Sequence, residues 1–501
     1  MSPQAKAVLS DLGGFLCVPG LVALTALVVG AVAGEPEVMV PLAVTAAVSL
    51  GGGLGLRHLC RGDLEDLRSP LGAVAVAVGW IGTAALGGLP LYLSAVNGGP
   101  SSMAPYGDVW SAFFEGMSAL TSTGLTMATD ASELPRAIQW WRSALEWVGG
   151  MGVVILALTL FKTHGNRISL VTAEINIEEF ARDDDEAVKR LWTVYAILTV
   201  ASALGFWAVG MPLWEAVNHG IAGVATGGFT VTSDSFVSYG AAVKWVGVVV
   251  MVLGAMDFAV HVRVLQKRKW RELWQDSQTV GLWAALVLGG IVLLGVTASR
   301  SDTGAATDAA FMWASALATC GFGAVDLTEW SGAALWVLTI GMFVGAAAGS
   351  TGGGLKIGRV ALLLKNVVWE IRALDDVRER TNRFGGEALE DEKASSLTHQ
   401  ASVLAVVFLA SLVAGTLALL VILGDEFSTM AVLFEATSAL GAVGISAGVT
   451  SPDLPAVAKA VMIVLMWLGR LEGMAALMLV AAVLDVAWGR DLEDAEGAEE
   501  D

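Results

Sequence analysis

One short pattern occurs four times in the chain and constrains its fold more than any other feature. In each copy a short apolar segment leads to a glycine, which is followed by one bulky apolar residue and then a small residue. The four glycines recur roughly every hundred residues, and they are Gly124, Gly228, Gly321 and Gly444. Self-similarity at such an interval indicates repeated structural units, so the chain is expected to contain four related units.

The residues between these copies are strongly apolar. Apolar residues make up 55% of the chain and charged residues only 15%, and the mean hydropathy is +0.67. Soluble domains have about 25% charged residues, so this composition indicates a polytopic membrane protein. A membrane-spanning helix needs about 20 apolar residues. Windows of that kind fall near 8–33, 37–60, 71–96, 138–161, 190–210, 243–265, 279–299, 331–373 (interrupted), 400–424 and 457–488.

Four further apolar stretches are too short to cross a bilayer. They lie near 108–123, 213–227, 308–320 and 427–442, each just before one of the glycines, and they predict re-entrant segments. The predicted fold is therefore an all-α polytopic membrane protein, with two leading helices and then four units of outer helix, pore helix and inner helix around a central pore. The predicted boundaries are 1–69 for the leading helices, 70–162, 163–272, 273–385 and 386–490 for the four units, and 491–501 for an acidic tail.

Charge indicates how the chain is oriented. Lys and Arg gather in the loops after residues 60, 161, 265 and 373, and the positive-inside rule places these loops and both termini in the cytoplasm of a cell-membrane protein. The net charge is −19, with the acidic excess in loops and tail. That excess fits a halophilic host, because high salt screens such charges, or else ordinary solvated loops. The three cysteines predict neither a disulfide framework nor a metal site.

The four re-entrant segments are then expected to open outward. Acidic residues are expected to concentrate cations at their mouths. These residues are Asp108, Asp130, Asp234, Asp308, Asp326, Asp425 and Glu426.

Non-helical backbone at membrane depth must be buried in protein or line a wet cavity, because lipid cannot satisfy its amides. Four such segments around one axis would form a ring of carbonyl oxygens that replaces the hydration shell of a cation. Glycine admits the backbone angles that such a ring needs and leaves no side chain in the way. The predicted ion-binding residues are Thr123, Gly124, Gly227, Gly228, Cys320, Gly321, Val443 and Gly444.

Four motifs resemble those of the Trk/Ktr/HKT superfamily of potassium transporters. They are Trp147–Gly152, Asn218–Phe229, Ala348–Lys356 and Gly469–Glu472, and the likeness extends from about residue 70 to 488. The resemblance implies four outer helix–pore–inner helix repeats, a homodimer in the lipid bilayer, and potassium uptake under the control of a cytoplasmic TrkA/KtrA-like ring of nucleotide-binding subunits. It implies potassium, held by the filter carbonyls, as the substrate.

Details of the filter refine this resemblance. Glycine at all four filter positions is similar to the potassium-selective members, whereas members that favour sodium have serine in the first. Cys320, Gly323 and Ala442 depart from the residues that are more usual there.

The gate is predicted in the third and fourth units. The run Gly349, Ser350, Thr351, Gly352, Gly353 and Gly354 cannot continue a helix cheaply, because each glycine costs up to about 1 kcal/mol. It predicts a mobile intramembrane gate or, alternatively, a static break between helices. Lys356 either ends this gate or extends to the membrane interface. Arg470 lies mid-helix and is expected to repel cations in the pore, or to form an ion pair with Glu472 or Glu146.

Three other polar residues lie in apolar segments. Asp257 and His261 share a helix face, which favours a hydrogen-bonded pair over proton coupling. His219 has no second ligand near it in the sequence and is expected to be a packing residue.

The predicted function is channel-like potassium uptake by a chain that has no cofactor and no nucleic-acid partner. Two alternatives remain open within transport: a symporter coupled to sodium or protons, and a less selective potassium/sodium pathway. A membrane enzyme is disfavoured, because no nucleophile and base are suitably spaced at membrane depth.

Overall fold

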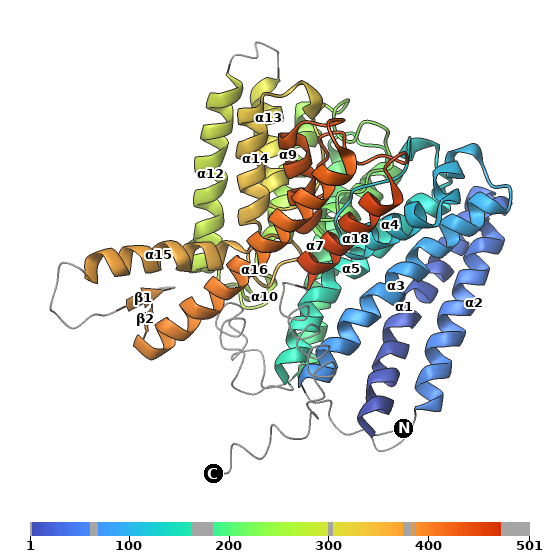
Figure 1. The fold of residues 1–501 in the computed structure, drawn as a ribbon, viewed down its shortest axis with the longest axis horizontal. Helices are drawn as coiled ribbons and strands as arrows, with labels where there is room; N and C mark the ends of the chain where they lie inside the picture. The colour runs from blue at the N-terminus through green and yellow to red at the C-terminus, as the bar shows by residue number, and fades with distance from the viewer. Residues whose placement is uncertain are drawn as a thin grey trace.

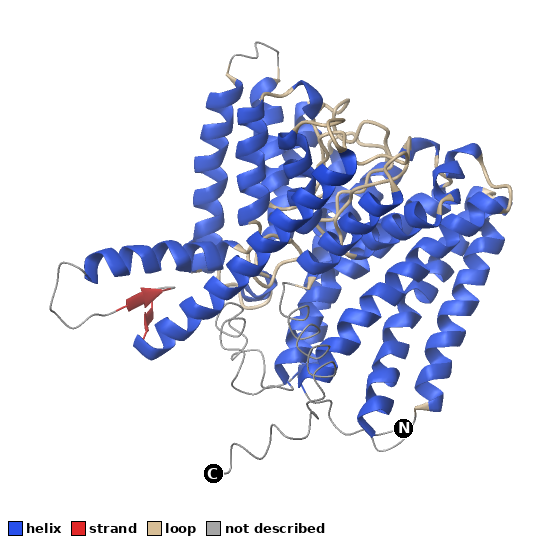
Figure 2. Ribbon diagram, in the orientation of Figure 1, coloured by secondary structure: helices blue, strands red, loops and turns tan. Residues whose placement is uncertain are grey.

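The computed structural model describes residues 3–60, 69–162, 184–298, 304–373, 382–384, 387–389 and 391–471, and this part of the chain is almost entirely helical (Figures 1 and 2). The leading helices are α1 (Pro3–Ala33) and α2 (Pro36–Leu59). The helices of the first unit are α3 (Ser69–Val96), α4 (Val109–Leu120) and α5 (Arg136–Lys162). Those of the second are α7 (Asp184–Ala208), α8 (Leu213–Val224), α9 (Ala241–Ala255) and α10 (Phe258–Leu265).

The third and fourth units follow the same order. A short α11 (Glu272–Gln275) leads to α12 (Ser277–Thr297), α13 (Ala305–Leu317), α14 (Gly332–Val344) and α15 (Ile357–Ala373). The fourth unit has α16 (Asp391–Leu423), α17 (Thr429–Leu440) and α18 (Ala456–Arg470). A small antiparallel hairpin, β1 (Asn382–Phe384) and β2 (Glu387–Leu389), precedes α16. Short 3₁₀ turns lie at Ser101–Gly107, Ala131–Glu133 and Leu327–Glu329.

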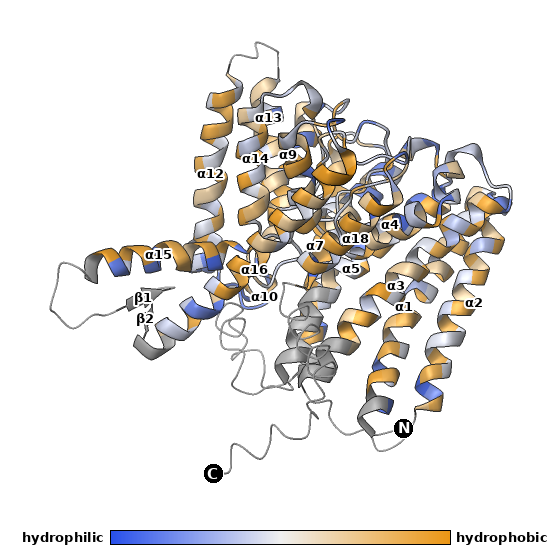
Figure 3. Cartoon of the chain, in the orientation of Figure 1, coloured by the Kyte–Doolittle hydropathy of each residue, from blue (hydrophilic) through white to orange (hydrophobic). Residues whose placement is uncertain are grey.

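Six described helices are long and apolar enough to cross a membrane, and a seventh span results if α9 and α10 count as one. Most residues of these helices are hydrophobic, as the colouring of α12 illustrates (Figure 3). Leu288 and Ile291 on α12 are 64% and 61% exposed. Because water would penalise such exposure, these surfaces are suited to lipid. The chain is a multi-pass membrane protein.

Each unit contains a short helix just before its repeated glycine, as the short apolar stretches predict. α4, α8, α13 and α17 are only 12 or 13 residues long. Capping residues fix where two of them begin: the carboxylate of Asp108 accepts hydrogen bonds from the first-turn amides of α4, and the hydroxyl of Ser428 accepts one from the first turn of α17. These residue types satisfy amides that a helix itself leaves unpaired.

The four units form a closed ring. The inner helix of each unit packs against the short helix of the next: α5 against α8, α9 against α13, α14 against α17, and α18 against α4. The last of these contacts returns to the first unit, so the short helices surround one axis. The loops that follow them gather on the upper face of the molecule, while α1 begins at the lower face (Figures 1 and 2).

The window 243–265 is not one straight helix. Its helix breaks at Met256–Asp257, and α9 and α10 meet at 103°. Asp257 caps the new helix by accepting a hydrogen bond from Ala259 N at 2.8 Å, and Phe258 N donates to the carbonyl of Gly349 at 3.1 Å. Hydropathy does not register such a break, because the residues on both sides of it are equally apolar. The last predicted window, 457–488, is described only as far as residue 471.

Candidate functional site

The four repeated glycines meet at the centre of the ring. A β-carbon added to any one of them would overlap the carbonyl oxygen of the residue just before the glycine of the next unit. The glycine–carbonyl pairs are Gly124 with Gly227, Gly228 with Cys320, Gly321 with Val443, and Gly444 with Thr123. The pairs close on themselves in the same order as the helices. All eight residues predicted to bind the ion therefore lie in one constriction, which we call the carbonyl ring.

The backbone repeats the same conformation in all four units. The glycines have φ of +88°, +87°, +92° and +98°, in the left-handed region that glycine adopts without strain. The residues two positions earlier, Ser122, Thr226, Thr319 and Ala442, have φ between 49° and 52°. Two features therefore exclude a side chain at each ring glycine: the neighbouring carbonyl oxygen leaves no space for it, and the positive φ would strain any other residue. Cys320 contributes its carbonyl, while its thiol turns towards the carbonyl of Gly223 at 3.9 Å.

Three of the short helices hold the loop that follows the ring. In each of them, the side chain nine residues before the ring glycine accepts a hydrogen bond from the backbone amide three residues after that glycine. The three pairs are Glu115 with Met127 N at 2.8 Å, Met312 with Ala324 N at 3.2 Å, and Glu435 with Ala447 N at 2.9 Å. We call these contacts the latches. The sequence offers one signal that could have revealed them, which is an acidic residue in a short apolar helix.

In the second unit the latch position holds His219. Its Nδ1 lies 3.4 Å from the sulfur of Met211, and its ring packs against Phe236, Tyr239 and Phe322. His219 is therefore a packing residue, as its isolation in the sequence suggests. Within the described ranges, no three His, Cys, Asp or Glu side chains are placed to hold a metal ion.

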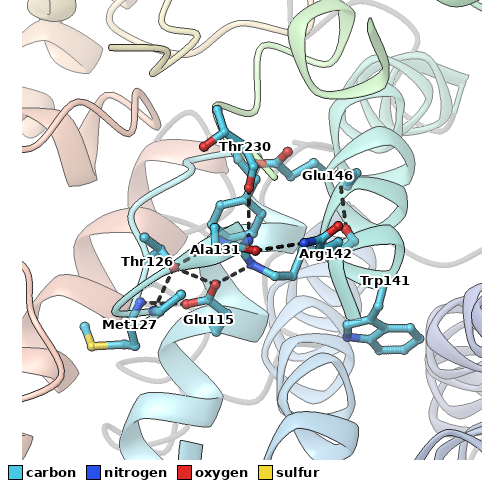
Figure 4. A network of polar contacts seen from close by, with 12 residues as sticks. Glu115, Thr126, Met127, Ala131, Trp141, Arg142, Glu146 and Thr230 are labelled. Carbon is cyan, nitrogen blue, oxygen red and sulfur yellow. Dashed lines mark hydrogen bonds and ion pairs between the residues drawn. The ribbon is translucent and has the colours of Figure 1, made fainter. Parts of the chain in front are cut away.

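Arg142 joins the first two units behind the ring (Figure 4). Its Nε lies 2.7 Å from Glu115 Oε1, its Nη2 donates to Thr126 Oγ1 at 3.0 Å, and its Nη1 donates to the carbonyl of Thr230 at 3.3 Å. The guanidinium carbon also lies 3.9 Å from the ring centroid of Phe229. Arg142 and Glu115 are both buried, and breaking such a pair is costly because it leaves an uncompensated charge. The sequence does not reveal this role, because the partners of Arg142 lie on other segments of the chain.

The predicted gate run crosses beneath the carbonyl ring. Thr351 Oγ1 donates to the carbonyl of Val224 at 2.9 Å, Gly353 N donates to Thr319 Oγ1 at 2.6 Å, and Gly354 N donates to the carbonyl of Gly441 at 3.0 Å. These three acceptors lie at the C-terminal ends of α8, α13 and α17. The run therefore contacts the base of three filter segments and is buried among them.

Arg470 links this run to the first unit. Its Nη1 donates to the carbonyl of Thr351 at 2.8 Å, and its Nη2 donates to those of Gly149 and Gly150 at 2.7 and 3.0 Å. Of the two ion-pair partners considered for it, Glu146 accepts a hydrogen bond from Phe229 N instead, and Glu472 lies outside the described residues.

Lys356 fits the first of its two alternatives, whereas the polar pair of the second unit differs from expectation. Lys356 is buried, and its ammonium group donates to the carbonyl of Gly352, so it stays inside the loop and does not extend to the interface. Asp257 and His261 each bond the backbone rather than one another. Asp257 accepts from Ala259 N, and His261 Nε2 lies 2.8 Å from the carbonyl of Leu253.

Two of the seven mouth carboxylates are neutralised by lysines. Asp108 lies 2.9 Å from Lys459 Nζ, and Asp308 lies 2.7 Å from Lys244 Nζ. Burial raises the pKa of Asp108, but hydrogen bonds from Lys459 and Ser111 lower it more, so its pKa lies below the usual value. Hydrogen bonds from Thr328 likewise lower the pKa of Asp326. Two of the acidic residues expected to attract cations are therefore already paired with lysines.

Comparison with known proteins finds one family model that matches most of the chain. The model is TrkH, described as a cation transport protein, and it matches residues 43–298 and 295–488. The Trk system potassium uptake protein TrkH of Halomonas elongata is 32% identical, over 86% of this chain and 89% of that protein. The protein of the same name from Escherichia coli K12 is 29% identical, over 84% and 86%. The crystal structure of the potassium transporter TrkH from Vibrio parahaemolyticus superposes with a TM-score of 0.82 at 26% identity, covering 95% and 98% of the two chains.

Proposed function

The chain belongs to the TrkH family of cation transport proteins, and we propose that it carries potassium ions into the cell through the carbonyl ring. The observation that supports this proposal best is the closed order of the glycine–carbonyl pairs. Carbonyl oxygens that converge on one axis can replace the hydration shell of a potassium ion. The membrane potential then drives entry, at about 2.3 kcal/mol per charge for each 100 mV. Potassium is the substrate, and the chain needs no cofactor of its own.

We propose that the run Gly349–Gly354, with Lys356, is the gate and that Arg470 closes it. Three filter segments hold the run from above, and Arg470 ties it to α5 from the side. Arg470 also adds a positive charge beneath the ring, where a low dielectric strengthens repulsion of a cation. Opening requires the run to leave this position, and its glycines supply the flexible backbone for that movement.

The likeness to TrkH proteins and the basic residues that follow α10 both bear on regulation. We propose a homodimer in the plasma membrane, with both termini in the cytoplasm and a cytoplasmic ring of nucleotide-binding subunits as its partner. Exposed Lys267, Arg268, Lys269 and Arg271 follow α10 and form one docking surface. We propose the same role for the stretch from Arg378 to Arg383, of which Arg378 and Arg380 lie outside the described residues and Arg383 lies in β1. The unit boundaries at 70–162, 163–272, 273–385 and 386–490 belong to this proposal.

Single-channel recording of the purified protein in a mixed potassium and sodium gradient tests the function. The reversal potential is expected near that of potassium and should not move when a proton gradient is added. A flux that stops without a proton or sodium gradient at clamped voltage would indicate a symporter instead. Equal permeation of both cations would indicate a less selective pathway.

A further inference from the structure

The residue just before the ring glycine has a side chain in three units but is itself a glycine in the second. The residue before the ring glycine is Thr123, Cys320 or Val443 in three units, but Gly227 in the second. The structure supplies the reason. A β-carbon on Gly227 would lie 2.5 Å from the carboxyl carbon of Glu146, so this carboxyl group fills the space that a side chain would need.

Glu146 bonds two neighbouring filter segments. It lies on α5, about three turns from the first residue of the helix, and is fully buried. Its Oε1 accepts a hydrogen bond from Phe229 N at 3.0 Å, just after the ring glycine of the second unit. Its backbone carbonyl accepts one from Ser122 Oγ at 2.9 Å, just before the ring glycine of the first. Figure 4 shows Glu146 on the same helix as Arg142, beside the loop that carries Thr230.

The bond to Phe229 N controls a carbonyl of the filter. In a trans peptide the N–H and the C=O lie in one plane and point in opposite directions. Because the N–H of Phe229 points at Glu146, the C=O of Gly228 in the same peptide points away from α5. The hydrogen bond to the carboxyl group holds this peptide in one orientation. Without it, the glycine peptide is free to rotate, since Gly228 has no side chain to restrain it.

The second unit has no acidic or thioether latch, and the described hydrogen bond from Glu146 holds a different amide of its loop, the one directly after the ring glycine. Glu115, Met312 and Glu435 hold the other three loops from their own short helices, whereas His219 occupies the corresponding position here. Arg142 cannot replace Glu146, because a guanidinium group has no acceptor for the hydrogen bond that Phe229 N donates. The restraint therefore comes from the preceding unit's inner helix.

We infer that Glu146 is the positioning residue of the second filter segment: its carboxyl group orients the Gly228 carbonyl, and Gly227 is a glycine to make room for it. This inference rests on the proposed function, because it assigns a role within the conducting ring. It adds a determinant of ion selectivity that lies outside the ring itself.

Two substitutions separate the hydrogen bond from the charge. Glu146→Ala removes the acceptor and is expected to lower potassium-over-sodium selectivity about tenfold, which corresponds to about 1.4 kcal/mol. Glu146→Gln keeps an acceptor oxygen of the same shape and is expected to stay within about threefold of the parent. Reversal potentials in mixed salts measure both. Parent selectivity in Glu146→Ala, or equal losses in the two variants, would overturn the inference.

Glu35 offers a matched control. Its carboxylate also accepts backbone amides of α5, from Arg136 N at 2.7 Å and Ala137 N at 3.0 Å, but at the upper end of the helix. Glu35→Gln is expected to keep the parent selectivity. A change equal to that of Glu146→Ala would mean that losing any carboxyl group bonded to α5 or carried by it disturbs the filter, and the specific role of Glu146 would be lost.

A separate pair of variants tests whether Gly227 makes room for the carboxyl group of Glu146. Gly227→Ala alone is expected to abolish flux, and adding Glu146→Ala is expected to restore flux with reduced selectivity, because the two groups compete for one space. If Gly227→Ala alone conducts like the parent, the space is not filled as inferred. Size-exclusion profiles in detergent establish that each variant is folded.

A binding measurement keeps this inference separate from the proposed function. Thermal unfolding of the purified parent is expected to shift upward more in potassium than in sodium, by the stabilisation that a bound ligand confers. No preference in the parent would contradict potassium binding itself. A preference in the parent that persists undiminished in Glu146→Ala would contradict only the role of Glu146.

Discussion

The ammonium nitrogen of Lys459 lies 2.9 Å from a carboxylate oxygen of Asp108, which bonds the last described helix of the chain to its first short helix. The same carboxylate caps α4 through Trp110 N and Ser111 N. One side chain thus starts a pore helix and closes the ring of units. Lys244 and Asp308 make the corresponding contact between α9 and α13.

The first prediction concerns this closure. Lys459→Met removes the ion pair but preserves the aliphatic part of the side chain, and it is expected to destabilise the protein by about 1 kcal/mol, because Asp108 is partly solvated. The measurement is the thermal unfolding midpoint in detergent. Lys244→Met is the matched variant, and a similar effect is expected. If neither variant unfolds earlier than the parent, these pairs do not help to hold the ring closed.

The same contact predicts a response to acid. The pKa of Asp108 in the folded protein lies below the ordinary value of 3.8. Stabilisation from a lowered pKa is present above the ordinary value and is lost as the pH falls through the folded-state pKa. The difference in unfolding midpoint between the parent and Lys459→Met should therefore stay constant from about pH 8 to 5 and shrink below about pH 4. A difference that disappears already at pH 6 would contradict this assignment.

Ring glycines should not tolerate side chains. Gly124→Ser is expected to reduce discrimination against sodium, because its side chain would displace the carbonyl of Gly227. Gly444→Val, with a larger side chain, should abolish flux while the protein still inserts. Gly107→Ser is the control, since a β-carbon there meets open space. An unchanged reversal potential in Gly124→Ser would argue against this ring as the filter.

Two substitutions of Arg470 separate the effect of its charge from that of its hydrogen bonds. Arg470→Ala is expected to raise basal flux severalfold, because both the repulsion and the three bonds to carbonyls are lost. Arg470→Lys keeps the charge but cannot reproduce that planar set of donors. An intermediate flux is therefore expected for it in liposome uptake assays. Deleting Gly349–Gly354 should raise flux most, and parent-like flux in all three would place the gate elsewhere.

The acidic latches should stabilise the fold more than the methionine latch does. Glu435→Ala leaves the buried amide of Ala447 and the hydroxyl of Ser446 without their acceptor. A loss of about 1–3 kcal/mol per unsatisfied group is expected, together with loss of flux. Met312→Leu removes only a weak sulfur acceptor and is expected to cost less. Unfolding midpoints compare the two. Equal effects would mean that the residues act through packing rather than through the amide bond.

The sequence by itself predicted the helical units, the four short helices and the glycines at their ends. Those features depend on local hydropathy, helix length and backbone permissiveness, which a single stretch of chain displays. The interruption between α14 and α15 was visible for the same reason, because Gly349–Gly354 cannot continue a helix. The break between α9 and α10 was not visible, because the residues directly before and after Asp257 are apolar and the glycine loop that bonds to Phe258 lies far along the chain.

Tertiary structure alone decided which groups meet. Nothing near Gly227 in the sequence explains its missing side chain, because the carboxyl group that fills the space belongs to Glu146 in the preceding unit. Arg470 likewise found its partners in Thr351, Gly149 and Gly150, and Lys459 found Asp108. Such contacts join residues from different units around the axis. Local patterns specify each unit, but only the closure of the ring brings one unit's side chains against the next unit's backbone.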